Sequence, residues 1–152
     1  MESGAKASGD ANVPRKEVTY KVIGVVMGVH NELGPGHREE VYQQALVRRL
    51  PETELVVEEQ VPVEITLDGG GLLTYYLDLR VEQDVIVELK ALSHPLTSDD
   101  IAQVIDYLAA TGYPVALLLN FGRERLEYRR ILPPRKIADR RRRRWSKPAP
   151  RP

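Results

Sequence analysis

Residues 72–92 read LLTYYLDLRVEQDVIVELKAL, and the fold of the chain can be worked out from this stretch. Apolar residues alternate with other residues through 72–81 and recur densely through 85–92, as expected of β-strands. The polar residues 82–84, Glu-Gln-Asp, separate the two segments and are few enough to form a hairpin loop. The sequence therefore predicts two neighbouring antiparallel strands joined by a tight turn.

The register of this hairpin places two acidic side chains opposite each other. A three-residue loop pairs Val81 with Val85, and the same register sets Asp78 against Glu88. Like charges at opposed positions destabilise a sheet unless something compensates. A divalent cation compensates well, because carboxylate oxygens and water are the ligands that Mg2+ prefers. Lys90 lies two residues beyond Glu88 on the same face, where it could balance the remaining charge or orient a water.

A second interpretation of the same residues stays open. Arg80 and Lys90 could pair with Asp78 and Glu88 as a partly exposed network of ion pairs, an arrangement that is common and has little effect on stability. On these four residues alone, the sequence does not separate a metal site from such a network.

The remaining elements follow from the spacing of apolar residues on either side of this hairpin. The alternation also predicts that Leu77, Leu79 and Leu89 lie on one core face of the hairpin. The predicted elements, in chain order, are helices at 18–33 and 37–50, strands at 57–67, 72–81 and 85–92, a capped helix at 97–112, and strands at 115–121 and 126–131. This order predicts an α/β fold, a mixed sheet of about five strands flanked by helices. The helix at 97–112 makes a crossover that sets its two neighbouring strands parallel.

Length and composition predict a single domain with two polar ends. The chain has 152 residues, 42% of them hydrophobic, which fills one core. We expect residues 1–16 to be a disordered N-terminal lead, residues 17–132 to form the domain, and residues 133–152 to be a basic tail rich in Pro and Arg. The absence of cysteine excludes disulfides, thiolate zinc sites and a cysteine nucleophile. No apolar run is long enough for a membrane span or a signal peptide, so we expect a cytoplasmic protein without a membrane partner.

The charge of the chain is distributed unevenly. Residues 129–152 contain 11 Lys and Arg and one acid, whereas residues 1–128 contain 11 Lys and Arg and 21 acids. The tail includes one aromatic residue directly after a run of arginines, a combination that can neutralise phosphates and stack on a base. It could equally be a solvated segment folded against the acidic body, or have a membrane or targeting role. The residues concerned are Arg140, Arg141, Arg142, Arg143, Arg144 and Trp145.

Three motifs resemble one family of proteins. Asp78 followed by Glu88-Leu89-Lys90 on the next strand resembles the signature of the PD-(D/E)XK nuclease superfamily, with Leu77 at the position of its proline. The segment 36–42, GHREEVY, is similar to the Gly-x-x-Glu-x-x-Tyr of the bacterial GxxExxY family, which looks like a branch of that superfamily. The segment 103–107, QVIDY, matches the Gln-x-x-x-Tyr of RecB-type members. The resemblance covers about residues 17–131.

The resemblance implies a Mg2+- or Mn2+-dependent nuclease that acts on DNA or RNA. It assigns the metal to Asp78, Glu88 and the backbone carbonyl of Leu89, with Glu39 reaching it directly or through water, and it gives Lys90 a catalytic role beside the two acids. It assigns contacts with substrate, or support of the metal ligands, to Gln103, Tyr107 and Tyr42. Related nucleases often form dimers, so a homodimer is open.

A function of another class stays open beside this one. The small size, the acidic body and the separate basic tail also fit a non-catalytic, nuclease-like module that binds nucleic acid or another protein. The two functions differ in whether the acidic pair is needed for metal binding and cleavage.

Overall fold

The computed structural model describes residues 13–134. Most of the predicted lead and nearly all of the basic tail, including Arg140 to Arg144 and Trp145, lie outside the described residues. The elements in chain order are α2 (Lys16–Leu33), α3 (Glu39–Arg49), the short 3-10 helix η1 (Leu50–Thr53), β1 (Val57–Thr66), β2 (Leu72–Val81), β3 (Val85–Lys90), α4 (Ser98–Thr111), β4 (Val115–Asn120) and β5 (Glu127–Ile131).

The five strands form one mixed sheet in the order β1-β2-β3-β4-β5. Neighbouring strands are antiparallel except for β3 and β4, which are parallel and joined through α4. The predicted α/β fold, its five strands and its parallel pair are therefore confirmed. Strand β3 ends at Lys90, two residues earlier than expected, because the Leu92 N–H bonds to the Asn120 side chain instead of a neighbouring strand.

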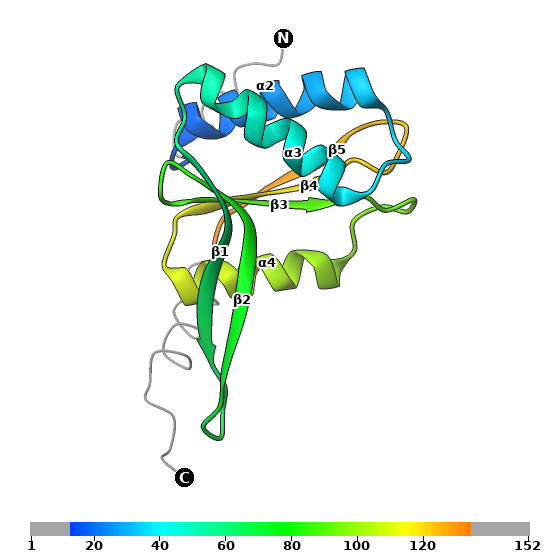
Figure 1. Cartoon of the computed structure of the whole chain (residues 1–152). Helices are drawn as coiled ribbons and strands as arrows, with labels where there is room; N and C mark the ends of the chain where they lie inside the picture. Colours follow the sequence, from blue (N-terminus) through cyan, green and yellow to red (C-terminus); the bar gives the residue numbers. More distant parts are fainter. Residues whose placement is uncertain (1–12, 135–152) are drawn as a thin grey trace.

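The two faces of the sheet are covered by different helices. Helices α2 and α3 lie over one face and α4 over the other (Figure 1). In β3, Val85 and Val87 pack into the cluster under α2 and α3, whereas Ile86 packs into the cluster under α4. Strands β3 and β4 are thus buried on both faces, which explains their nearly continuous apolar sequence.

The β1–β2 hairpin bends away from the rest of the sheet. Strands β1 and β2 pair on both sides of Gln60 and Asp78, but β2 pairs with β3 only from Leu79 to Val81, and the part of the hairpin beyond that ladder projects past α4 (Figure 1). At the bend, Gln60 has a left-handed φ of 49°, and the register between β1 and β2 skips Gln60 and Asp78. The bend changes which side of the sheet the side chains of β2 face. Leu79 packs under α2 and α3, whereas Leu77, two residues earlier, packs under α4. The prediction that both residues share one face is therefore wrong.

Helix α4 begins with the capping residues that the sequence predicts. The Thr97 hydroxyl accepts a hydrogen bond from the Asp100 N–H, and the Asp100 carboxylate accepts one from the Thr97 N–H. Gly112 ends the helix with a φ of 76°. Within the described part of the chain, no helix combines the length and hydropathy that crossing a bilayer requires.

Candidate active site

Two acidic side chains meet where β2 leaves β3. The ladder between these strands ends at Leu79 and Val87. Beyond it, the Asp78 N–H donates to Glu88 Oε2 at 2.9 Å, and the Leu89 N–H donates to Asp78 Oδ2 at 2.8 Å. Side-chain oxygens thus replace the next ladder bonds, so Asp78 and Glu88 are close, as predicted, without forming a strand pair.

The pair is unfavourable when both acids are charged. Glu88 is 7% exposed, and burial followed by the charge of Asp78 raises its pKa to about 8. Burial also raises the pKa of Asp78, although the hydrogen bond from Leu89 and the charge of Lys90 work in the opposite direction. The arrangement therefore favours either a proton or a cation between the two carboxylates.

This donor set fits a Mg2+ or Mn2+ ion. Each carboxylate accepts one hydrogen bond from a backbone N–H, and the two carboxylates also hydrogen-bond each other, so their oxygens converge on one place. The C=O and N–H of one residue point to the same side of a strand, so the Leu89 carbonyl also faces the gap between β2 and β3. Among residues 13–134, no three His, Cys, Asp or Glu side chains form a metal-binding group. Two carboxylates with a carbonyl and waters are nevertheless a usual environment for Mg2+.

Glu39 lies at the edge of this pair. It is the first residue of α3, where the helix dipole favours an acid. Its carboxylate accepts a hydrogen bond from the Ala91 backbone. The pKa of Glu39 is raised, mainly by loss of hydration and to a smaller extent by the charge of Asp78. The charge of Lys90 acts in the opposite direction and lowers it. The structure therefore brings Glu39 into electrostatic contact with the predicted site.

The two nearby cations do not form ion pairs with Asp78 and Glu88 within the described residues. Lys90 Nζ lies 3.8 Å from Asp100 Oδ1, and Arg80 binds Glu58 with contacts of 2.7 and 2.9 Å. The alternative of one ion-pair network is therefore wrong, because each cation has another acidic partner. Lys90 is still close enough for its charge to lower the pKa of both site acids.

Gln103 and Tyr107 lie one turn apart on α4. Tyr107 is 5% exposed, and burial followed by the charge of Glu88 raises its pKa, with smaller contributions from Tyr75 and Asp78. Tyr107 is thus within electrostatic reach of the acidic pair. Gln103 is exposed beside it.

Tyr42 belongs to α3 and is buried in the core between the helices and the sheet. Its ring stacks on Phe121 with centroids 4.4 Å apart. Its hydroxyl donates to the Gly34 carbonyl at 2.6 Å and accepts from the His37 N–H at 3.2 Å. Tyr42 therefore fixes the turn before α3, the helix whose first residue is Glu39.

Two glutamines that the sequence analysis did not select support Asp78. The Gln60 side chain hydrogen-bonds the Asp78 carboxylate. Gln43 Nε2, on α3, lies 3.5 Å from the Asp78 carbonyl and 3.3 Å from Glu59 Oε1. No motif marks Gln60, but Gln43 follows Glu39 by one helical turn, a spacing that could have identified it.

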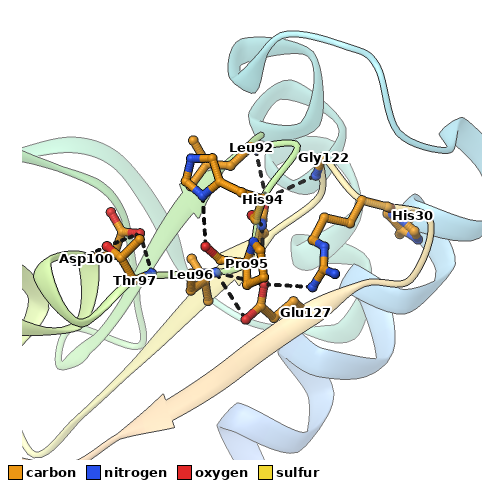
Figure 2. Close-up of polar contacts among 11 residues, drawn as sticks. His30, Leu92, His94, Pro95, Leu96, Thr97, Asp100, Gly122 and Glu127 are labelled. Carbon is orange, nitrogen blue, oxygen red and sulfur yellow. Dashed lines mark hydrogen bonds and ion pairs between the residues drawn. The ribbon is translucent and has the colours of Figure 1, made fainter.

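A buried amide anchors the loop that follows β3. Asn120 Oδ1 accepts hydrogen bonds from the backbone N–H groups of Leu92 and Gly122, at 2.9 and 3.1 Å (Figure 2). Asn120 Nδ2 donates to the His94 carbonyl at 3.0 Å and to Glu127 Oε1 at 3.3 Å. The fully buried Asn120 therefore uses all of its usual hydrogen-bonding capacity.

The same network continues to the residue that pairs with Lys90. Glu127 accepts two hydrogen bonds from the Leu96 N–H, at 3.0 and 3.2 Å, next to the Thr97–Asp100 cap in Figure 2. On the other side, the Phe121 N–H bonds to the Lys90 carbonyl at 2.9 Å. Lys90 and Asp100 are thus held by one continuous set of contacts. The network joins residues up to 31 positions apart, so no local pattern predicts it.

Comparison with known proteins gives two positive findings. A family model described as "PD-(D/E)XK nuclease superfamily" matches residues 16–131. No curated protein matches the chain. Among solved structures, the one titled "Crystal structure of SSO0001" is similar with a TM-score of 0.51 and 15% sequence identity. That match covers 66% of this chain and 54% of the other, so the chain spans about half of that protein, and the likeness concerns the fold alone.

Proposed function

Since the chain belongs to the PD-(D/E)XK nuclease superfamily, we propose that it is a divalent-metal-dependent nuclease that hydrolyses phosphodiester bonds of DNA or RNA. The observation that carries this proposal is the reciprocal contact of Asp78 and Glu88. A buried and a half-buried acid in contact, both with raised pKa values, are unfavourable in a purely structural role, whereas they match the needs of a bound cation.

The proposed metal is Mg2+ or Mn2+, with Asp78, Glu88 and the Leu89 carbonyl as its ligands. Bound there, such an ion would supply a water of lowered pKa and neutralise charge on the phosphate. Glu39 is proposed to hydrogen-bond a water at the edge of this site, with its carboxylate held by the Ala91 backbone.

Lys90 is the proposed catalytic cation. Its ammonium group can donate hydrogen bonds to a phosphate oxygen or to the attacking water, and it adds positive charge beside the acids. The ion pair with Asp100 limits where its Nζ can lie. Gln103 and Tyr107 are proposed to contact the substrate strand from α4, and Tyr42 is proposed to hold the turn before Glu39.

Within the superfamily, we assign the chain to the bacterial GxxExxY family and to the RecB-like branch. The support is sequence alone: the segment 36–42 and the pair Gln103 and Tyr107. Residues 17–132 are proposed as the catalytic domain. The arginines of the tail at 133–152 are proposed to contact phosphates, offsetting the 21 acids that precede residue 129.

Calorimetric titration of Mn2+ into the full chain and into Asp78→Asn tests this function. Cleavage of a plasmid and of a single-stranded oligonucleotide is measured on the same samples. We expect the substitution to remove both metal binding and cleavage while the protein stays folded. Cleavage by Asp78→Asn at the wild-type rate would contradict the proposal. Metal-independent binding of nucleic acid that is lost on deleting residues 135–152, without cleavage, would favour the non-catalytic module instead.

A further inference from the structure

A cavity lies between the projecting β1–β2 hairpin and α4. Its volume is about 170 Å³, which is smaller than the ~300–1,000 Å³ typical of pockets for drug-sized ligands. It has room for one small ring system. Its lining residues are Ile65, Leu67, Leu73 and Tyr75 from the hairpin and Gln103, Asp106 and Tyr107 from α4.

The cavity adjoins the proposed active site. Tyr107 lines it and also lies within electrostatic reach of Glu88 and Asp78. Tyr75 precedes Asp78 by three residues on β2, roughly 10 Å along an extended strand. A nucleotide next to a phosphate held at Asp78 and Glu88 can therefore reach the cavity.

The walls of the cavity have the chemistry that recognises a flat, polar-edged ring. The rings of Tyr75 and Tyr107 lie 5.4 Å apart between centroids, tilted by 57°, and provide an aromatic wall. Leu67 and Leu73 are 39% and 43% exposed, so the hairpin presents unpartnered apolar surface there. Base stacking on aromatic side chains is worth about 1–3 kcal/mol per base.

Gln103 adds a polar group at the same place. Its amide makes no hydrogen bond with any of the residues 13–134. An amide offers both a donor and an acceptor, which is the pattern found on the edges of nucleobases. A base inside a duplex presents neither a free face nor a free pairing edge, so only an unpaired base can enter.

We propose that this cavity binds one unstacked nucleobase next to the phosphate at Asp78 and Glu88, and that the substrate is single-stranded or locally unpaired nucleic acid. The inference rests on the proposed nuclease function for the position of that phosphate. It adds a base subsite formed by the hairpin, with Tyr75, Leu73 and Gln103 as its main contacts.

Filling the cavity tests the subsite against a matched control. Leu73→Trp places a large ring where Leu73 lines the cavity, whereas Leu72→Trp places the same ring one residue away, at a 63% exposed position. We expect Leu73→Trp to slow cleavage of a single-stranded oligonucleotide about tenfold, as for the loss of one base stack, and Leu72→Trp to leave it unchanged. Mn2+ binding should be the same in both variants.

An abasic nucleotide gives the second measurement. Moved along the oligonucleotide, it should slow wild-type cleavage about tenfold at one position relative to the cut, and it should not slow Leu73→Trp further. Cleavage at the same rate wherever the abasic nucleotide is placed would overturn the subsite. So would faster cleavage of intact duplex than of single strands, if Leu73→Trp does not change that preference. If Leu73→Trp does not fold, Gln103→Ala on the exposed face of α4 takes its place, with the same expected loss of sensitivity to the abasic nucleotide.

Binding of an oligonucleotide that contains 2-aminopurine separates this inference from the nuclease proposal. With Mn2+ present, we expect the fluorescence to be quenched at one position by wild type and Leu72→Trp, but not by Leu73→Trp. Quenching without any cleavage would contradict the nuclease function and leave the subsite standing. Cleavage without such quenching would contradict the subsite and leave the nuclease standing.

Discussion

The two faces of strand β3 differ in what their side chains do. On the face under α2 and α3, Val85, Val87 and Leu89 are all apolar and buried. On the opposite face Ile86 is apolar, but Glu88 and Lys90 follow it at the end of the strand, where the hairpin bends away. One short strand thus stabilises the domain through one face and carries charged side chains on the other. Substitutions on the two faces should therefore separate stability from activity.

The largest expected effect is the loss of cleavage in Lys90→Gln. The substitution removes the ammonium group from the charged face and leaves the apolar face intact. We expect cleavage to fall about 1,000-fold, as for the loss of a donor that stabilises charge in the transition state. The measurement is cleavage under single-turnover conditions, with Mn2+ binding as the control. Retained cleavage would assign Lys90 to the ion pair with Asp100 alone.

The apolar face should show the opposite behaviour. Leu117→Ala shortens a fully buried side chain of β4 under α2 and α3. We expect the free energy of unfolding in urea to fall by about 3 kcal/mol, while cleavage by the folded protein stays near wild type. Leu72→Ala, at a 63% exposed position, is the control and should change stability by less than about 0.5 kcal/mol. A large loss of cleavage in folded Leu117→Ala would break the separation between the faces.

Asn120→Ala should affect both properties at once. The substitution leaves the partly buried N–H groups of Leu92 and Gly122 without their acceptor and frees the loop between Lys90 and α4. We expect a loss of about 2 kcal/mol in the free energy of unfolding, together with slower cleavage and unchanged Mn2+ binding. Hydrogen exchange of the Leu92 amide reports the loop directly. Unchanged exchange there would show that Asn120 does not hold the loop.

Sequence alone predicted the parts of this arrangement that depend on local pattern. The hairpin register followed from the length of residues 82–84, and it brought Asp78 and Glu88 together correctly. The crossover helix followed from the Thr97 cap and the Gly112 stop. These features are determined by neighbouring residues, so a single sequence contains enough information for them.

The features that sequence missed depend on contacts between distant segments. A left-handed backbone conformation within a strand is usually found at glycine. Position 60 is a glutamine, so the sequence did not indicate the bend there. Without the bend, strict alternation placed Leu77 on the wrong face. The partners of Asn120 are distant in sequence and are found only in the folded chain.

A pH dependence should distinguish the charged face from ordinary surface acids. The pKa of Glu88 is raised in the folded state, so the unfolded chain ionises first and folding is favoured most at low pH. Between pH 5 and 8 without metal, we expect wild type to lose about 1–2 kcal/mol of unfolding free energy relative to Glu88→Gln. Added Mn2+ should reduce the loss.

The control for this measurement is Glu58→Gln. The Arg80 side chain lowers the pKa of Glu58, so any contribution of that acid to stability is lost only at lower pH. Wild type and Glu58→Gln should therefore follow the same pH profile from 5 to 8. Equal pH profiles for wild type and Glu88→Gln would show that Glu88 is not protonated in the folded protein.

The smallest expected effect concerns the bend itself. Gln60 holds Asp78 by a side-chain hydrogen bond while its backbone adopts a φ of 49°, which is unfavourable for any residue with a Cβ. Gln60→Gly removes the bond and the strain together, so we expect about tenfold slower cleavage with stability equal to or slightly above wild type. Gln60→Ala removes the bond and keeps the strain, so it should show the same loss of cleavage with lower stability than the glycine variant. If both variants cleave at the wild-type rate, the contacts of Asp78 with Leu89, Glu88 and Gln43 hold it without Gln60, and the bend has no role in the site.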